Sequence, residues 1–374
     1  MRRTAHPTVA LASVLVATIA LAACSGSSGS DGSASTTSAG SSKGTASSTT
    51  AEAKAVRAAP AGKEATGKPT PSAGCGTSST RSVVLEKQFL DDSDRWWLLT
   101  TPLEHDGKTP LPLVVDYHGL SEGANIHSKM SNFSPFALDH GFILATPNGT
   151  GTPTRWQISP DTKTNADLQF TDQMLDQLEA NLCVDTSRVY ATGLSNGAFI
   201  SSAIGCAMSE RFAAIAPVAG LLRPLPCTTS HPMPVLTFHG TDDPILLFNG
   251  GVGDRLGEVM SKGVGGVDPS SDQLPEADLD GPGYPANAKD WALQNGCKAT
   301  YTETKLTDTV THRVYDDCPA DGPVEFNIIQ GGGHSWPGSE FSQNVGKVVG
   351  TTDMSIDADE LIWAFFQRFQ LPSS

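Results

Sequence analysis

From residue 111 onward, short continuous apolar runs alternate with longer stretches whose apolar residues have helical spacing. The strand-like runs are residues 111–117, 141–146, 188–192, 234–238 and 325–329. The helix-like stretches are residues 167–182 and 198–208, and a C-terminal stretch with Ile356, Leu361, Ile362, Phe365, Phe366 and Phe369 on one side. Short buried strands that alternate with amphipathic helices predict an α/β fold with a mostly parallel central sheet flanked by helices.

The first 73 residues have a different composition. Arg2 and Arg3 precede an apolar stretch, residues 8–20, and the segment Leu21-Ala22-Ala23-Cys24 is typical of a bacterial lipoprotein signal. We therefore predict that residues 1–23 are removed and that lipid on Cys24 anchors the protein to the outer face of a bacterial membrane. The alternative is an ordinary cleaved signal. Residues 24–73 are rich in Ser, Gly, Ala and Thr and predict a disordered tether.

The remaining residues, 74–374, are enough for one α/β domain. The chain carries a formal net charge of -15, which argues against nucleic acid as a partner because phosphate binding relies on basic surface. No spacing typical of a zinc site occurs, and we expect neither a metal nor an organic cofactor.

Six cysteines follow Cys24, an even number that predicts disulfides in an exported protein. Cys297 and Cys318 flank a predicted hairpin through residues 301–315, which favours that pair. We also expect Cys206 to pair with Cys227, and elimination leaves Cys75 with Cys183.

The pentapeptide Gly193-Leu194-Ser195-Asn196-Gly197 stands between a predicted strand and a predicted helix. A serine at such a place lies on a sharp turn, and the two glycines remove side chains that would clash there. This context predicts a nucleophile elbow with Ser195 as the nucleophile. The N–H of Asn196, at the start of the helix, is a predicted oxyanion donor.

Two later strands supply partners for the serine. Residues 234–238 run into His239-Gly240-Thr241-Asp242-Asp243, which places two candidate acids after a strand. Residues 325–329 run into a glycine-rich turn that carries His334, the predicted base. The order serine, acid, histidine is the one that the α/β-hydrolase fold requires. We interpret His239 as a residue that braces the acid loop.

Other loops complete the predicted site. The strand 111–117 ends in His118-Gly119-Leu120, and we assign the second oxyanion donor to the N–H of Leu120. Trp156 and Trp336 are candidate substrate contacts, the alternative for each being a tryptophan that covers a loop. His127 has no partner that the sequence identifies.

Four segments together resemble the polyhydroxybutyrate depolymerase and feruloyl esterase family of secreted hydrolases. They are residues 116–119, residues 188–198, residues 239–243 and the Gly-His-Ser-Trp-Pro-Gly segment at 333–338. The resemblance implies an α/β-hydrolase fold and favours Asp243 over Asp242 as the acid. Residues 249–287 depart from the family pattern as an insertion, which we interpret as a lid or as loops that contact substrate.

The resemblance implies a serine esterase that hydrolyses feruloyl, acetyl or hydroxyalkanoate esters through Ser195, His334 and Asp243. A polyhydroxybutyrate or other polyester depolymerase is an alternative within the same chemistry. An alternative of another class is a ligand-binding surface lipoprotein without catalytic activity, because a fold alone does not guarantee activity.

Overall fold

The computed structural model describes residues 63–77, 82–103, 105–272, 274–319 and 321–372. The predicted signal peptide, Cys24 and most of the predicted tether lie outside the described residues. No helix among the residues described is long and apolar enough to cross a membrane.

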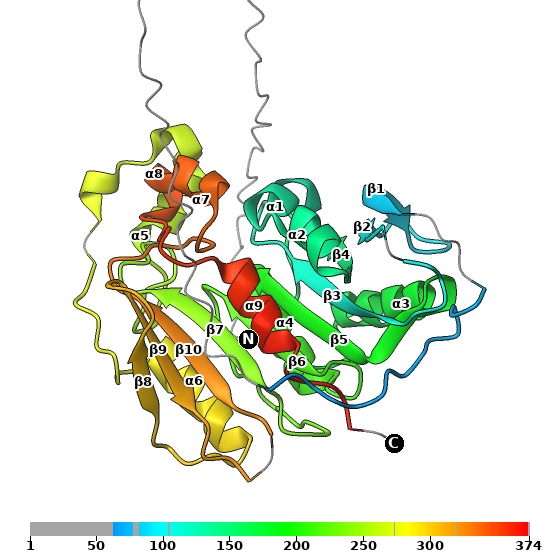
Figure 1. Ribbon diagram of the computed structural model, residues 1–374. Helices are drawn as coiled ribbons and strands as arrows, with labels where there is room; N and C mark the ends of the chain where they lie inside the picture. Colours follow the sequence, from blue (N-terminus) through cyan, green and yellow to red (C-terminus); the bar gives the residue numbers. More distant parts are fainter. Residues whose placement is uncertain (1–62, 78–81, 104, 273, 320, 373–374) are drawn as a thin grey trace, which may run out of the picture. The chain divides into compact units, whose positions relative to one another are not determined.

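The centre of the domain is one ten-stranded sheet with the order β1-β2-β4-β3-β5-β6-β7-β10-β9-β8 (Figure 1). The six middle strands, from β4 to β10 in this order, are parallel, and two antiparallel strands extend the sheet at each edge. The strands are β1 Val83–Phe89, β2 Trp96–Thr101, β3 Leu111–Tyr117, β4 Ile143–Pro147, β5 Val184–Leu194, β6 Ala214–Val218, β7 Val235–Gly240, β8 Thr302–Lys305, β9 Val310–Tyr315 and β10 Val324–Ile329. The predicted α/β class with a mostly parallel sheet is confirmed.

Helices cover both faces of the sheet. They are α1 Ala124–Met130, α2 Phe133–His140, α3 Ala166–Asn181, α4 Asn196–Ala207, α5 Asp254–Lys262, α6 Tyr284–Gln294, α7 Glu340–Asn344, α8 Gly346–Val349 and α9 Ala358–Phe366, with short 3₁₀ turns at Val264–Gly266 and Pro269–Ser271. On β3, Leu113 and Val115 belong to the core that contains residues of α3, α4 and α6, whereas Val114 belongs to the core that contains residues of α2 and α9. Successive side chains of a strand point to opposite faces of the sheet, so a fully buried strand contributes side chains to the hydrophobic cores on both faces.

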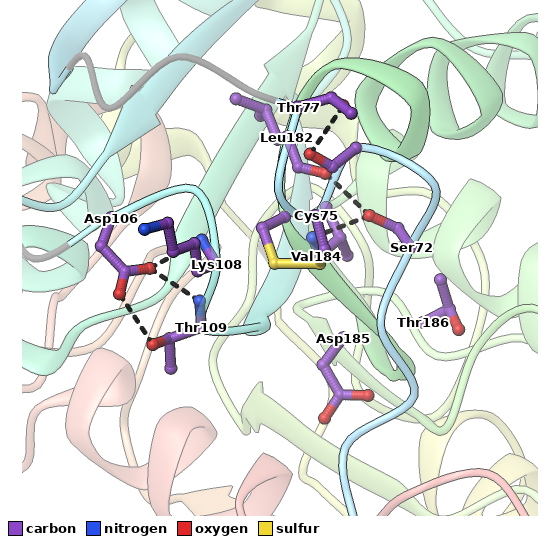
Figure 2. The surroundings of a disulfide bond; sticks show 12 residues. Ser72, Cys75, Thr77, Asp106, Lys108, Thr109, Leu182, Val184, Asp185 and Thr186 are labelled. Carbon is purple, nitrogen blue, oxygen red and sulfur yellow. Dashed lines mark hydrogen bonds between the residues drawn. A yellow bond between two sulfur atoms is a disulfide. The ribbon is translucent and has the colours of Figure 1, made fainter.

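All three predicted disulfides are present, namely Cys75–Cys183, Cys206–Cys227 and Cys297–Cys318. Figure 2 shows the surroundings of the first, which joins the start of the domain to the beginning of β5. Beside it, the Ser72 hydroxyl donates to the Leu182 carbonyl (2.7 Å) and accepts from the Val184 N–H (3.0 Å). The ordered domain therefore begins before residue 74, which was the predicted start of the domain after the tether.

The insertion, residues 249–287, contributes α5 and lies against the segment that contains α8. Arg255 of α5 is buried, pairs with Asp272, and donates to the carbonyls of Lys347 (2.8 Å) and Val348 (3.3 Å). The next carbonyl along the chain, that of Val349, accepts the His334 N–H at 2.5 Å. The insertion thus supports the backbone that holds the predicted base, and its action as a lid stays a prediction.

Candidate active site

Ser195 lies on a strained turn between β5 and α4. Its φ is 58° and its ψ is -114°, a conformation that costs a non-glycine residue free energy and is found mainly at functional sites. A Cβ on Gly197 would lie 2.0 Å from the Tyr117 carbonyl oxygen, and a Cβ on Gly193 would lie 2.4 Å from the same atom. Glycine at both positions lets β3 and the turn approach this closely, which is what the sequence pattern predicted.

The predicted acid and base are in direct contact. The Nδ1 atom of His334 lies 2.7 Å from Oδ2 of Asp243, and both residues are buried. Oδ1 of Asp243 accepts the N–H groups of Ile245 and Leu246, each at 2.8 Å. Burial by itself would raise the pKa of Asp243, but His334 and His239 outweigh burial and hold this pKa well below its usual range. Asp243 is therefore a carboxylate with a fixed orientation.

Asp242 has a different environment from its neighbour. Its side chain is exposed and accepts a hydrogen bond from the Thr241 hydroxyl at 3.0 Å. Of the two adjacent aspartates, only Asp243 pairs with the predicted base.

His239 is a second histidine beside the acid. Its Nε2 atom lies 3.2 Å from Oδ2 of Asp243 and 2.9 Å from the Leu246 carbonyl oxygen. Its ring stacks on Tyr284 with the ring centres 3.6 Å apart. These contacts fit the interpretation of His239 as a residue that braces the acid loop.

The two predicted oxyanion donors lie at the ends of neighbouring strands. Leu120 follows β3, and Asn196 begins α4 directly after Ser195. The Asn196 side-chain oxygen accepts the Trp156 N–H at 2.7 Å, so this side chain is used to hold a neighbouring loop. The backbone N–H of Asn196 stays at the first position of the helix, where it has no partner within the helix.

His118 braces the turn after β3 as a neutral imidazole. Its Nε2 atom accepts the Gly149 N–H at 2.9 Å, so its Nδ1 carries the proton and donates to the Gly119 carbonyl at 2.7 Å. Burial lowers the pKa of His118 to about 4, which keeps the ring uncharged in neutral solution.

The two candidate substrate contacts require a correction. Trp156 is 2 % exposed and donates from its indole N–H to the His118 carbonyl at 2.9 Å. Trp336 is 1 % exposed and donates to Oδ1 of Asp359 at 2.9 Å. Both rings are packed inside the domain with their polar atoms satisfied, so each stabilises a loop and neither presents a surface to substrate.

His127, Asp116 and Glu122 form a polar cluster beside the turn after β3, with His127 and Asp116 fully buried. This cluster was not predicted from the sequence. His127 lies 2.7 Å from Asp116 and 3.2 Å from Glu122. The three residues come from a strand, a turn and a helix. No spacing pattern in the sequence predicts that such residues are in contact. Among the described residues, no group of three or more histidine, cysteine, aspartate or glutamate side chains is arranged to hold a metal ion.

Ser195, Asp243 and His334 follow β5, β7 and β10, three strands of the parallel part of the sheet. In a parallel sheet the carboxyl ends of the strands share one edge, and ligands bind there. The sheet, the elbow and the paired acid and base define the class of protein as an α/β-hydrolase.

Comparisons with known proteins agree with this class. A model of the prolyl oligopeptidase family matches residues 128–231, which include the elbow. Feruloyl esterase B of Piromyces equi is 29% identical over 241 residues, or 63% of this chain and 41% of that protein. The match thus spans less than half of that relative. A probable feruloyl esterase C of Aspergillus niger is 29% identical over 220 residues, or 56% of this chain and 75% of that protein.

Among solved structures, an acetyl xylan esterase from Aspergillus awamori matches with a TM-score of 0.43 and 15% identity, over 70% of this chain and 98% of that one. In sequence, this chain is similar to feruloyl esterases.

Proposed function

We propose that this protein is a serine carboxylic-ester hydrolase. The observation that carries the proposal is the buried His334–Asp243 pair at 2.7 Å, on the same sheet edge as a serine held at a φ of 58°. An oriented histidine at a nucleophile elbow is the arrangement that activates a serine hydroxyl. Relatives named as feruloyl esterases support the choice of carboxylic esters.

In the proposed reaction, the Ser195 oxygen attacks the ester carbonyl carbon while His334 takes the hydroxyl proton. The N–H groups of Leu120 and Asn196 stabilise the oxyanion of the tetrahedral intermediate. The intermediate collapses, the carbon–oxygen bond to the alcohol breaks, and the alcohol leaves with the proton from His334. A water molecule then attacks the acyl-enzyme with the same histidine as base, which releases the carboxylic acid and restores Ser195. Asp243 keeps the ring oriented and stabilises its charged form.

For the substrate we propose feruloyl or acetyl esters, with hydroxyalkanoate polyesters as the second possibility within the same chemistry. The match to the prolyl oligopeptidase family makes a peptide bond the competing substrate class. Specificity depends on the shape of the loops around the triad, so hydrolysis rates on a set of substrates decide between these classes.

The test is hydrolysis by the purified protein of p-nitrophenyl acetate, methyl ferulate, acetylated xylan, 3-hydroxybutyrate oligomers and a prolyl-peptide anilide. We expect ester cleavage, and we expect a fluorophosphonate probe to label Ser195 in the wild type and to leave Ser195→Ala unlabelled. A folded protein that cleaves none of the esters would refute the proposal and favour the ligand-binding alternative. Cleavage of the anilide alone would favour a peptidase.

We also propose that the protein is secreted and held to a bacterial membrane by lipid on Cys24. The lipoprotein-like segment at residues 21–24 and the three disulfides support this location. Cells grown with labelled palmitate are expected to yield a labelled wild-type protein and an unlabelled Cys24→Ser variant. Equal labelling of the two proteins would contradict the anchor.

A further inference from the structure

The turn after β3 is closed by two reciprocal hydrogen bonds between Gly119 and Glu122. The Gly119 N–H donates to Oε2 of Glu122 at 2.7 Å, and the Glu122 N–H donates to the Gly119 carbonyl at 3.3 Å. A Cβ on Gly119 would lie 3.0 Å from the same carboxyl group, so the side chain fits closely against the turn. Leu120 lies inside this turn, and within the described residues no protein group accepts its N–H.

The Glu122 carboxylate is itself held by a charged histidine. Nδ1 of His127 lies 3.2 Å from Oε2 of Glu122, while Nε2 of His127 lies 2.7 Å from Oδ1 of Asp116. A neutral imidazole has one N–H and can donate to one of these carboxylates only, so the two contacts together require the doubly protonated ring. Burial alone would lower the pKa of His127, but Asp116 and Glu122 outweigh burial and raise it to about 10.

Burial and further contacts hold the cluster of Asp116, Glu122 and His127 in place. Asp116 and His127 are fully buried, and the Glu122 side chain is 17% exposed. The second oxygen of Asp116 accepts the Ser131 hydroxyl at 2.7 Å. Trp336 lies edge-on to His127 with ring centres 5.8 Å apart, and it is bonded to Asp359 of α9. Since Trp336 follows His334 by two residues, the same packing supports the turn after β3 and the turn that carries the base.

A carboxylate beside a developing oxyanion is unfavourable unless a positive charge compensates it. His127 supplies that charge next to Glu122 and therefore lets a glutamate serve as the acceptor in this turn. An acceptor is needed there, because an unpartnered Gly119 N–H would leave the turn free to rotate the Leu120 N–H away from the substrate carbonyl.

We propose that Glu122, held in place by His127, is the positioning residue for the oxyanion donor of Leu120. The inference rests on the proposed function, because it assigns a role within that same site. Glu122 does not transfer a proton and does not touch the substrate. It acts through the Gly119 N–H, and His127 acts through Glu122.

The first test is the kinetics of Glu122→Ala with p-nitrophenyl acetate. Loss of one oxyanion donor lowers kcat by about 10²-fold, and we expect an effect approaching this size with KM changed by less than about threefold. Glu122→Gln keeps a carbonyl oxygen that accepts the Gly119 N–H, so we expect it to recover kcat to within about tenfold of the wild type. A purely structural role would not produce this split between kcat and KM.

The matched control is Asp106→Ala, a substitution at the other end of β3. Asp106 accepts the N–H groups of Lys108 (2.8 Å) and Thr109 (2.6 Å) and so closes the turn that precedes the strand (Figure 2). It is the same kind of contact, made far from the catalytic edge, and we expect kcat to stay within twofold of the wild type.

The outcomes separate the two proposals. A wild-type protein without esterase activity refutes the proposed function, whereas an active wild type with an equally active Glu122→Ala variant overturns the positioning role of Glu122. A second measurement covers the case in which Glu122→Ala does not fold. In the wild type, NMR of the His127 ring, assigned with His127→Gln, is expected to show a doubly protonated ring up to about pH 9, because Asp116 and Glu122 face it and Asp359 lies behind Trp336. A ring that titrates near pH 6.5 overturns the inference.

Discussion

Replacing Asp243 by asparagine is expected to lower kcat for ester hydrolysis by about 10⁴-fold, the loss found when the acid of such a triad becomes an amide. An amide at this position presents an N–H to His334 Nδ1 or loses its contact with it. The ring then adopts the wrong tautomer, with the proton on the nitrogen that must accept from Ser195. The free energy of unfolding also falls, because the N–H groups of Ile245 and Leu246 lose a charged acceptor.

Asp242→Asn is the matched control for this prediction. The change in charge is identical and the position is adjacent, but the Asp242 side chain is exposed and has no contact with His334 among the described residues. We expect its kcat to remain within about twofold of the wild type, since exposed substitutions away from special contacts have small effects. Steady-state kinetics on p-nitrophenyl acetate measure both variants, and a reversed ranking would assign the acid to Asp242.

Removing the Cys75–Cys183 disulfide, by alanine at both positions, is expected to cost about 5 kcal/mol of unfolding free energy. The bond closes a loop with a sequence separation of 108, and the entropy that such a cross-link removes from the unfolded chain grows with loop length. In the folded state the bond also holds the segment that contains Ser72 against the start of β5 (Figure 2). Urea unfolding followed by circular dichroism measures the change.

The Cys206–Cys227 pair provides the comparison, because its sequence separation is only 21. The same entropy model gives about 3 kcal/mol for its removal. Both double variants are expected to keep their esterase activity below their unfolding temperatures, since neither bond contacts Ser195 or His334. A larger loss of stability for Cys206–Cys227 would show that loop length does not determine the ranking.

The features that the sequence predicted correctly are those that depend on neighbouring residues. Strand 111–117 coincides with β3, and the run 325–329 differs from β10 by a single residue, because buried parallel strands are continuous apolar runs. The turn at Ser195 follows from two glycines at fixed positions. The Cys297–Cys318 pair also follows from the order of elements, since this bond closes off the hairpin of β8 and β9.

The features that the sequence missed depend on how distant elements meet. Trp156 and Trp336 lie in or near loops of the predicted site, but their rings are buried and donate hydrogen bonds to the His118 carbonyl and to Asp359. An aromatic residue near a site has the same local pattern whether it lines the cleft or supports it from behind. The partners of His127 could not be predicted from the sequence either. Asp116 lies on a strand and Glu122 on a turn, and only the folded chain brings both carboxylates to the His127 ring.

The path of residues 70–75 shows at which end of the domain the chain enters it. This segment follows the beginning of β5, with Thr70 bonded to Asp185 and Cys75 to Cys183, while Ser195 lies past the other end of the same strand. Eleven residues of strand separate the two ends by roughly 30 Å. The proposed lipid anchor would thus be connected to the domain at the end away from Ser195, which would leave the predicted catalytic edge open to substrate.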